Sequence, residues 1–344
     1  GERVVSAHET LQHQGIVDGA RLTCVSVEAT DEWQKRVVQE WEKGITAAWL
    51  EDDSWQVWED LRVLSLDGRF NQPFPAEALP VGLQSLKLWP GFNQSLRGVT
   101  WPVGLQTLQF GKSFNQSLEG LSLPAGLRVL QFGKAFNQRL QDVDLPTSLE
   151  QLVLGEGREG DFNQPLQGVS LPPGLQVLEF GRNFNQSLVG LALPAGVKRL
   201  EFGTDFNCSL QGVALPAALQ TLVFGFAFDQ PLGAVALPAG LQHLEFGICF
   251  NQSLLGVSLP VGLRTLVFEQ SFNQPLQGVN LPSGLQTLTF GRHESAHQSF
   301  NHPLDGALPA GLESLTLGSE FNQLVQGLAL PQGLKNLKFG SGFN

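Results

Sequence analysis

The sequence contains one pattern that could do chemistry, two histidines that flank a glutamate. His293, Glu294 and His297 match the H-E-x-x-H signature of zinc proteases. In those enzymes one helical face presents both imidazoles to the metal, and the glutamate acts as general base. His302 follows closely enough to be a third ligand. A zinc-dependent hydrolase is therefore one candidate function, provided that a long helix carries these residues.

The sequence around the signature leaves little room for such a helix. The signature lies between Gly291 and Phe300, in an insertion that lengthens one interval of a repeating unit from 22 to 28 residues. A second insertion, residues 155–161, is rich in glycine but lacks the Gly-Lys-Ser/Thr ending of a phosphate-binding loop. We therefore predict no enzymatic activity and no cofactor, and we keep zinc hydrolysis as the less favoured alternative.

The repeating unit accounts for most of the chain. A phenylalanine followed by asparagine, or once by aspartate, recurs at a spacing of 22 residues in nine of twelve intervals. A fixed period of this length indicates a solenoid, in which each unit stacks only on its neighbours. The recurring phenylalanines are Phe70, Phe92, Phe114, Phe136, Phe162, Phe184, Phe206, Phe228, Phe250, Phe272, Phe300, Phe321 and Phe343.

Each unit predicts one short strand. In residues 105–110 the pattern Leu-x-x-Leu-x-Phe puts Leu108 and Phe110 on one face of an extended chain. The pattern first occurs at residues 61–66, so we expect about thirteen parallel strands, roughly 4.8 Å apart. Glycines follow the strands and are expected to take positive φ there, while the Leu-Pro pairs exclude a continuous helix on the opposite side. The predicted fold is a mainly β repeat solenoid.

The asparagine after each phenylalanine is expected to form a hydrogen-bond ladder along the solenoid. An amide suits this place because it supplies both donors and an acceptor. Asp229 replaces the asparagine once, and an ionised carboxylate cannot donate. We therefore predict that the ladder is weakest at Asp229.

The complete unit, Phe-Asn-Gln-Ser/Pro-Leu-x-Gly-Val-x-Leu-Pro-x-Gly-Leu-Gln-x-Leu-x-Phe-Gly, resembles the FNIP repeat, a relative of the short leucine-rich repeats. The resemblance extends over residues 61–344. It implies an interaction module and brings no catalytic residues. Because the asparagine directly follows the phenylalanine, the unit departs from the usual leucine-rich repeat, and the curvature of the solenoid stays open.

The chain before residue 61 has a different organisation. Residues 1–28 contain a turn and an alternating strand pattern whose order resembles the C-terminal half of a ubiquitin-like domain. Residues 29–60 are acidic and rich in tryptophan, with Trp33 and Trp41 on one predicted helical face. We interpret residues 29–60 as a short α-helical cap over the first rung, because solenoids need their ends covered. A peptide-binding tryptophan platform is the alternative.

Composition restricts the partners. Of the net charge of −11, residues 1–67 hold −8 (6 Lys/Arg against 14 Asp/Glu), so nucleic acid and anionic membranes are disfavoured. No apolar run approaches the roughly 20 residues that span a bilayer, which argues against membrane insertion. Three cysteines, Cys24, Cys208 and Cys249, are an odd number and suggest free thiols. We therefore expect the cytoplasm or another reducing intracellular compartment.

The outward strand positions are the best candidates for recognition, because they vary between rungs while the core positions do not. In the middle rungs an apolar patch with a polar rim is predicted, which is typical of an interface. Drift at positions that tolerate valine is the competing interpretation. The patch comprises Val223, Phe226, Ile248 and Val267, and its rim comprises Arg199, Glu201, His243 and Glu245.

The function predicted from the sequence is a non-enzymatic scaffold or adaptor that binds another protein through the outward strand face. The identity of that protein partner is not predicted. A structural spacer subunit within a larger assembly is the alternative. Binding of carbohydrate or ice would need a regular row of identical groups, whereas Thr107, Val129 and Gln151 follow one another in the same column.

Overall fold

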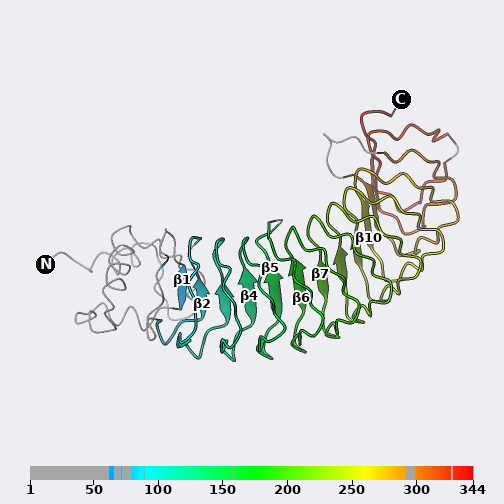
Figure 1. Cartoon of the computed structure of the whole chain (residues 1–344). Coiled ribbons are helices and arrows are strands. Elements are labelled where there is room, and N and C mark those ends of the chain that lie inside the picture. The colour runs from blue at the N-terminus through cyan, green and yellow to red at the C-terminus, as the bar shows by residue number, and fades with distance from the viewer. Residues whose placement is uncertain are drawn as a thin grey trace, which may run out of the picture.

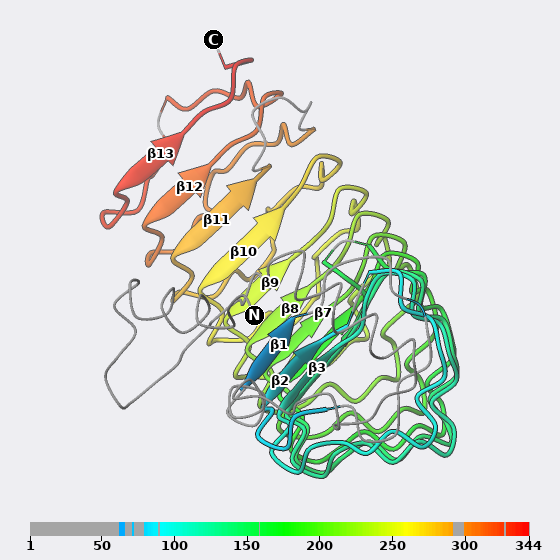
Figure 2. The same cartoon turned by 90° about the vertical axis from the view of Figure 1, so that its left-hand side faces the viewer.

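The computed structural model describes residues 62–65, 71, 79–88, 90–157, 159–291, 299–326 and 328–343. One short strand per rung forms a single parallel sheet in which each strand pairs with the next along the chain, as Figure 1 shows for the first rungs and Figure 2 for β7 to β13. The thirteen strands expected from the repeat are thereby confirmed. They are β1 (Val63–Ser65), β2 (Ser85–Lys87), β3 (Thr107–Gln109), β4 (Val129–Phe132), β5 (Gln151–Leu154), β6 (Val177–Phe180), β7 (Arg199–Glu201), β8 (Thr221–Val223), β9 (His243–Glu245), β10 (Thr265–Phe268), β11 (Thr287–Phe290), β12 (Ser314–Thr316) and β13 (Asn336–Lys338).

The described part of the chain contains no α-helix, and so no helix there that is long and apolar enough to cross a membrane. The predicted ubiquitin-like segment, residues 1–28, and the predicted helical cap, residues 29–60, both lie outside the described residues.

Strand register turns each position of the repeat into a row that runs along the solenoid. Leu200 of β7 pairs with Leu222 of β8, and Leu222 pairs with Leu244 of β9. These leucines are fully buried, whereas the residues on either side of each point outward. Because a strand alternates its faces, equal register in every rung keeps core rows and surface rows apart.

Besides its leucine rows, the core contains two rows of stacked phenylalanine rings, of which the strand-end row has leucine instead at Leu88, Leu154 and Leu317. Phe202, at the end of β7, stacks on Phe206 of its own rung with ring centroids 3.8 Å apart and on Phe224 of the next rung at 5.6 Å. Phe206 stacks on Phe228 at 6.0 Å. All four rings are buried. The phenylalanine of each Phe-Asn pair therefore points inward, as the repeat predicts.

Spacing between rungs widens from the sheet to the Phe-Asn row, and this bends the solenoid. Strands in a sheet lie about 4.8 Å apart. The ring pair Phe202–Phe224, at the strand ends, is 5.6 Å apart, and Phe184–Phe206, farther from the sheet, is 6.1 Å apart. The strand face must then lie on the inner side of the curve. Figure 2 agrees, since β12 and β13 are displaced toward the side that carries the strands.

Several of the glycines that follow strands are required by close stacking, whereas Gly291, after β11, has the expected positive φ of 81°. Gly203, Gly225 and Gly247 do not have positive φ, so the expectation for these turns was wrong. A Cβ atom at Gly225 would instead overlap the carbonyl group of Gly203, and one at Gly247 would overlap that of Gly225. These turns therefore touch through their backbones, and a side chain at Gly225 or Gly247 would push two rungs apart.

The predicted asparagine ladder is present and uses the side-chain oxygen. Asn185 Oδ1 accepts the backbone N–H of Asn207 at 2.9 Å, and the same bond recurs between neighbouring rungs. Asp229 Oδ1 accepts from Asn251 N at 2.9 Å and from Gln252 Nε2 at 3.0 Å. The prediction of a weak point at Asp229 was wrong, because the ladder needs an acceptor there and a carboxylate is a good one.

We predict that Phe184→Ala lowers the free energy of unfolding by about 3 to 5 kcal/mol, because Phe184 is fully buried between rungs that cannot collapse onto the cavity. Urea unfolding followed by circular dichroism measures the change. Phe226→Ala is the matched control, since Phe226 is 48% exposed. Equal losses in the two variants would contradict a closed core at Phe184.

We predict that Gly225→Ala destabilises the protein by about 3 kcal/mol through overpacking against Gly203. Gly233→Ala is the control, because a Cβ atom there meets no atom within 4 Å and the backbone φ is not positive. The two thermal unfolding curves distinguish the variants. If Gly225→Ala melts like Gly233→Ala, close backbone stacking does not limit this turn.

Candidate functional site

The middle of the outward strand face carries most of the predicted site residues. In β6 to β9 the first and third residues of each strand point outward, and equal register aligns them in two columns. All are half-buried rather than fully exposed. The eight residues, here called the middle strand face, are Val177, Glu179, Arg199, Glu201, Thr221, Val223, His243 and Glu245.

Arg199 joins two glutamates of this face. Its Nε donates to Glu179 Oε1 at 3.0 Å, and its Nη2 donates to Glu201 Oε2. Burial alone would lower the pKa of Arg199, but the two carboxylates outweigh that effect and raise it. Arg199 therefore stays a fixed cation that orients both glutamates.

Glu201 lies in an unfavourable environment for its negative charge. Burial raises the pKa of its carboxyl, Arg199 partly opposes this, and the like charges of Glu179 and Glu245 raise the pKa further. The three carboxylates therefore interact electrostatically along one column of the sheet.

His243 and Glu245 form a second polar pair on β9. His243 Nε2 lies 3.2 Å from Glu245 Oε2, and because an ionised carboxylate only accepts, we assign the ring proton to Nε2. Val223 lies between Glu201 and Glu245 in the column and pairs with both in register. The face thus presents one apolar residue between two carboxylates.

Phe226 and Ile248 occupy the turns just beyond β8 and β9 and lie next to each other. Cys249 N, which follows Ile248, donates to the carbonyl oxygen of Phe226 at 2.8 Å, so the two turns are stacked. Phe226 is 48% exposed and Ile248 is half-buried. Together they form an apolar turn edge along one margin of the middle strand face.

Val267 does not join this surface. It pairs with Glu245 in register, as expected, but it is only 1% exposed. Thr289 in the next strand is buried too. The predicted apolar patch is therefore smaller than expected and consists of Val223, Phe226 and Ile248.

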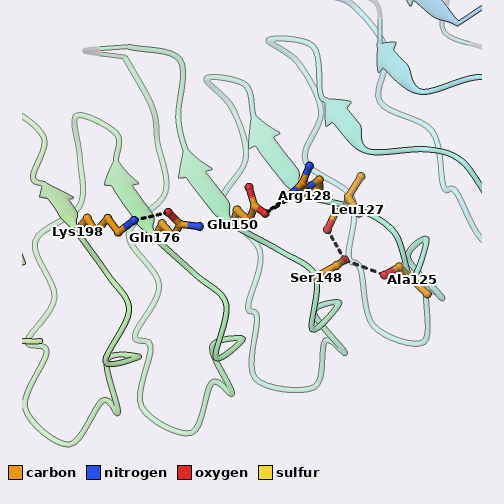
Figure 3. A network of polar contacts seen from close by, with 7 residues as sticks. All are labelled: Ala125, Leu127, Arg128, Ser148, Glu150, Gln176 and Lys198. Atoms are coloured by element: carbon orange, nitrogen blue, oxygen red, sulfur yellow. Dashed lines mark hydrogen bonds and ion pairs between the residues drawn. The ribbon is translucent and has the colours of Figure 1, made fainter. Parts of the chain in front are cut away.

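A polar row beside the strands was missed by the sequence analysis. Figure 3 shows it in the rungs of β4 to β7, at the residue just before each strand. Arg128 Nη2 donates to Glu150 Oε1 at 2.7 Å, and Lys198 Nζ donates to Gln176 Oε1 at 3.0 Å. Opposite charges spaced 22 residues apart were the signal in the sequence for the first pair. These bonds link neighbouring rungs and lie outside the middle strand face.

Figure 3 also shows a serine in the place of a recurring glycine. Ser148 Oγ lies within hydrogen-bond distance of two carbonyl oxygens of the preceding rung, at 2.7 Å from Ala125 and 2.6 Å from Leu127. Its role is therefore to join rungs.

The glycine-rich insertion closes on itself. Glu156 and Glu159 exchange two backbone hydrogen bonds of 3.0 Å. Their carboxylates reach Lys112 at 3.8 Å and Lys134 at 3.6 Å, respectively. The described residues of the turn therefore place two carboxylates beside lysines of the preceding rungs.

Of the four residues of the predicted zinc site, the structure describes His302. His293, Glu294 and His297 lie outside the described residues. His302 replaces a ladder glutamine, and its Nε2 lies 3.0 Å from the carbonyl oxygen of Asn273. Within the described ranges no group of three or more His, Cys, Asp or Glu residues is placed to hold a metal ion.

Two cysteines of the solenoid are free thiols, as expected. Cys208 and Cys249 are both half-buried, and burial raises the pKa of each thiol. A raised pKa reduces the thiolate fraction, so neither is an activated nucleophile.

Solved structures that resemble this chain include the following three. An internalin (InlF) from Listeria monocytogenes aligns over 91% of this chain and 89% of its own length, with 15% identity and a TM-score of 0.59, which supports the fold alone. CroV588, described as a novel circular leucine-rich-repeat protein, aligns over 83% of this chain at 29% identity and a TM-score of 0.48, and this chain spans 57% of its length. YopM from Yersinia enterocolitica aligns over 89% of this chain and 81% of its own length, at 16% identity and a TM-score of 0.37.

No curated protein matches the sequence. The model of the FNIP repeat matches residues 92–135, 162–205, 206–249, 250–293 and 300–342. These segments cover well over half of the chain, and they begin at the Phe-Asn pairs whose rings stack in the core. The chain therefore belongs to the FNIP repeat family.

Proposed function

We propose that this protein is a non-enzymatic interaction scaffold that binds another protein through the middle strand face and the adjoining apolar turn edge. The observation that carries the proposal is the contrast between rows. Inward rows repeat leucine and phenylalanine from rung to rung, whereas the outward columns of β6 to β9 change between charged, polar and apolar residues. Because the outward side chains differ from rung to rung, this part of the surface has a composition of its own, which suits recognition of a particular partner.

The rigidity of the solenoid favours such binding. The outward side chains stand on strands whose inward neighbours are fully buried, and Arg199 and His243 are held by their carboxylate partners. A surface that is already ordered loses little conformational entropy when a partner binds. The inward curvature of the strand face adds contact area, because a concave surface follows a convex partner.

The apolar turn edge supplies the anchor. Phe226 is a large aromatic side chain that is 48% exposed and flanked by Ile248. Aromatic residues dominate the binding energy of many interfaces when a partner covers them. Phe226 replaces residues such as Lys112, Lys134 and Arg182 at the same position of other rungs, so this edge differs from the rest of the row.

We predict that Phe226→Glu with Ile248→Glu removes partners that the native protein captures from the lysate of its source. Two buried charges at the interface would oppose docking. Quantitative mass spectrometry of the captured proteins measures the loss. The control is Val189→Glu with Leu255→Glu, which introduces the same charges at exposed apolar positions away from the strands.

Partners lost only from the Phe226/Ile248 variant would support recognition at the turn edge. Partners retained by both variants would refute it. If the native protein captured nothing above background, the structural spacer would replace the scaffold as the better hypothesis. Matching thermal unfolding of both variants is required, so that misfolding does not imitate loss of binding.

A further inference from the structure

We propose that the partner segment bound by the middle strand face is a basic, extended peptide whose two cationic side chains, three residues apart, reach Glu201 and Glu245. This inference rests on the proposed function and specifies the chemistry of the partner. The strand face would then recognise a pair of basic residues, and Val223 would be the apolar contact residue between the two carboxylates.

Negative charge on the outward strand face is confined to the middle rungs. Among the outward positions of the described strands, carboxylates occur only at Glu179, Glu201 and Glu245. The middle strand face carries one permanent cation, Arg199, against these three. The formal charge of the middle strand face is therefore negative. The outward residues of β2 to β5 and of β10 to β13 contribute no carboxylate. Charge complementarity favours a cationic partner at this place and not elsewhere along the sheet.

Arg199 binds Glu201, and on the side of Glu201 toward β8 the neighbouring residue is the uncharged Val223, so a cation from a partner could approach there. The guanidinium lies on the first column of β7 and binds Glu179 and Glu201 together. On the other side, Glu201 faces Val223 of β8, which brings no charge. The pKa of Glu201 is raised by burial and by the like charges of Glu179 and Glu245, so an added cation would relieve repulsion that Arg199 does not remove.

His243 helps to set the orientation of the second carboxylate. Its Nε2 lies 3.2 Å from Glu245 Oε2, on the same strand. A carboxylate accepts several hydrogen bonds, so contact with His243 is compatible with contact to a guanidinium from the partner.

The spacing of the two carboxylates selects the spacing of the cations. Glu201 and Glu245 stand two strands apart in the same column, which corresponds to about 9.6 Å. Three residues of polyproline II rise about 9.3 Å and return to the same side of that helix. In a β-strand, by contrast, residues three apart point to opposite faces. A polyproline II segment that crosses the strands would therefore place both cations over the carboxylates.

The apolar character of Val223 is consistent with this mode of binding. Val223 would contact the part of the peptide that lies between the two cationic side chains. Arginine packs its aliphatic stem on apolar surface while its guanidinium stays in a polar environment. Proline rings between the two arginines would also pack on valine. The apolar turn edge lies beyond the end of the same strands, where it could contact residues that flank the basic pair.

The test uses the full chain and labelled synthetic peptides measured by fluorescence anisotropy. The probe is Pro-Arg-Pro-Pro-Arg-Pro, and its spacing controls carry the two arginines two or four residues apart. We expect the three-residue spacing to bind most tightly. We also expect Glu201→Gln with Glu245→Gln to weaken binding by about tenfold, since two charge pairs are lost.

The matched variant is Glu150→Gln with Glu313→Gln, which removes two half-exposed glutamates from the row beside the strands. Binding to this control should stay within about twofold of the native protein. Affinity for the native protein should also fall as salt rises, because the contact is between charges. The spacing comparison on the native protein requires no substitution, so a folding defect cannot obscure it.

Three results would overturn the inference: no binding of the probe below about 1 mM, equal binding at all three spacings, or equal binding to both glutamine variants. Failure here is separable from failure of the proposed function. If captured proteins are lost from the Phe226/Ile248 variant but retained by the Glu201/Glu245 variant, the scaffold stands and the basic segment is wrong. Loss from both variants together with the expected peptide series supports both.

Discussion

Stacking of one phenylalanine ring on the next aligns the described rungs of the solenoid, and the surface rows depend on that alignment. The rings at most strand ends and at the Phe-Asn turns form two buried rows, and at Gly225 and Gly247 neighbouring turns touch through their backbones with no room for a side chain. Such close packing permits one register between rungs. Because the register is equal, every position of the repeat becomes a row, and the outward rows can change without disturbing the core.

The same stacking produces the curvature. Rings near the sheet are closer to their neighbours than rings at the Phe-Asn turns, so each rung is a wedge that is narrow on the strand side. The strand face becomes concave, and residues from separate rungs, such as Glu201 and Glu245, converge on one ordered surface. A partner would meet a preformed arrangement whose spacing is set by the rungs rather than by flexible loops.

Particular residues show where inference from sequence stopped. The inward leucines and phenylalanines, the parallel order of the strands and the asparagine ladder all followed from periodicity. Asp229 and Gly225 did not: the ladder uses an acceptor oxygen, and the turn excludes a Cβ atom through contact with the neighbouring rung. Val267 is an outward strand residue that is nevertheless buried. Each of these facts concerns atoms from two rungs, and a single repeat unit does not contain that information.

The sequence by itself determined the architecture of this protein, because a period of 22 residues with inward leucine and phenylalanine leaves one way to bury the apolar face, which is to stack. It also determined which positions vary outward. Only the tertiary structure decided the direction of the curve and the hydrogen bonds from Arg199 to Glu179 and Glu201. It also decided that Val267 is buried while Val223, Phe226 and Ile248 reach the surface. The physical reason is that residues far apart in sequence, such as Arg199 and Glu179, interact only after the rungs have packed, and the exposure of a side chain is a property of that packing.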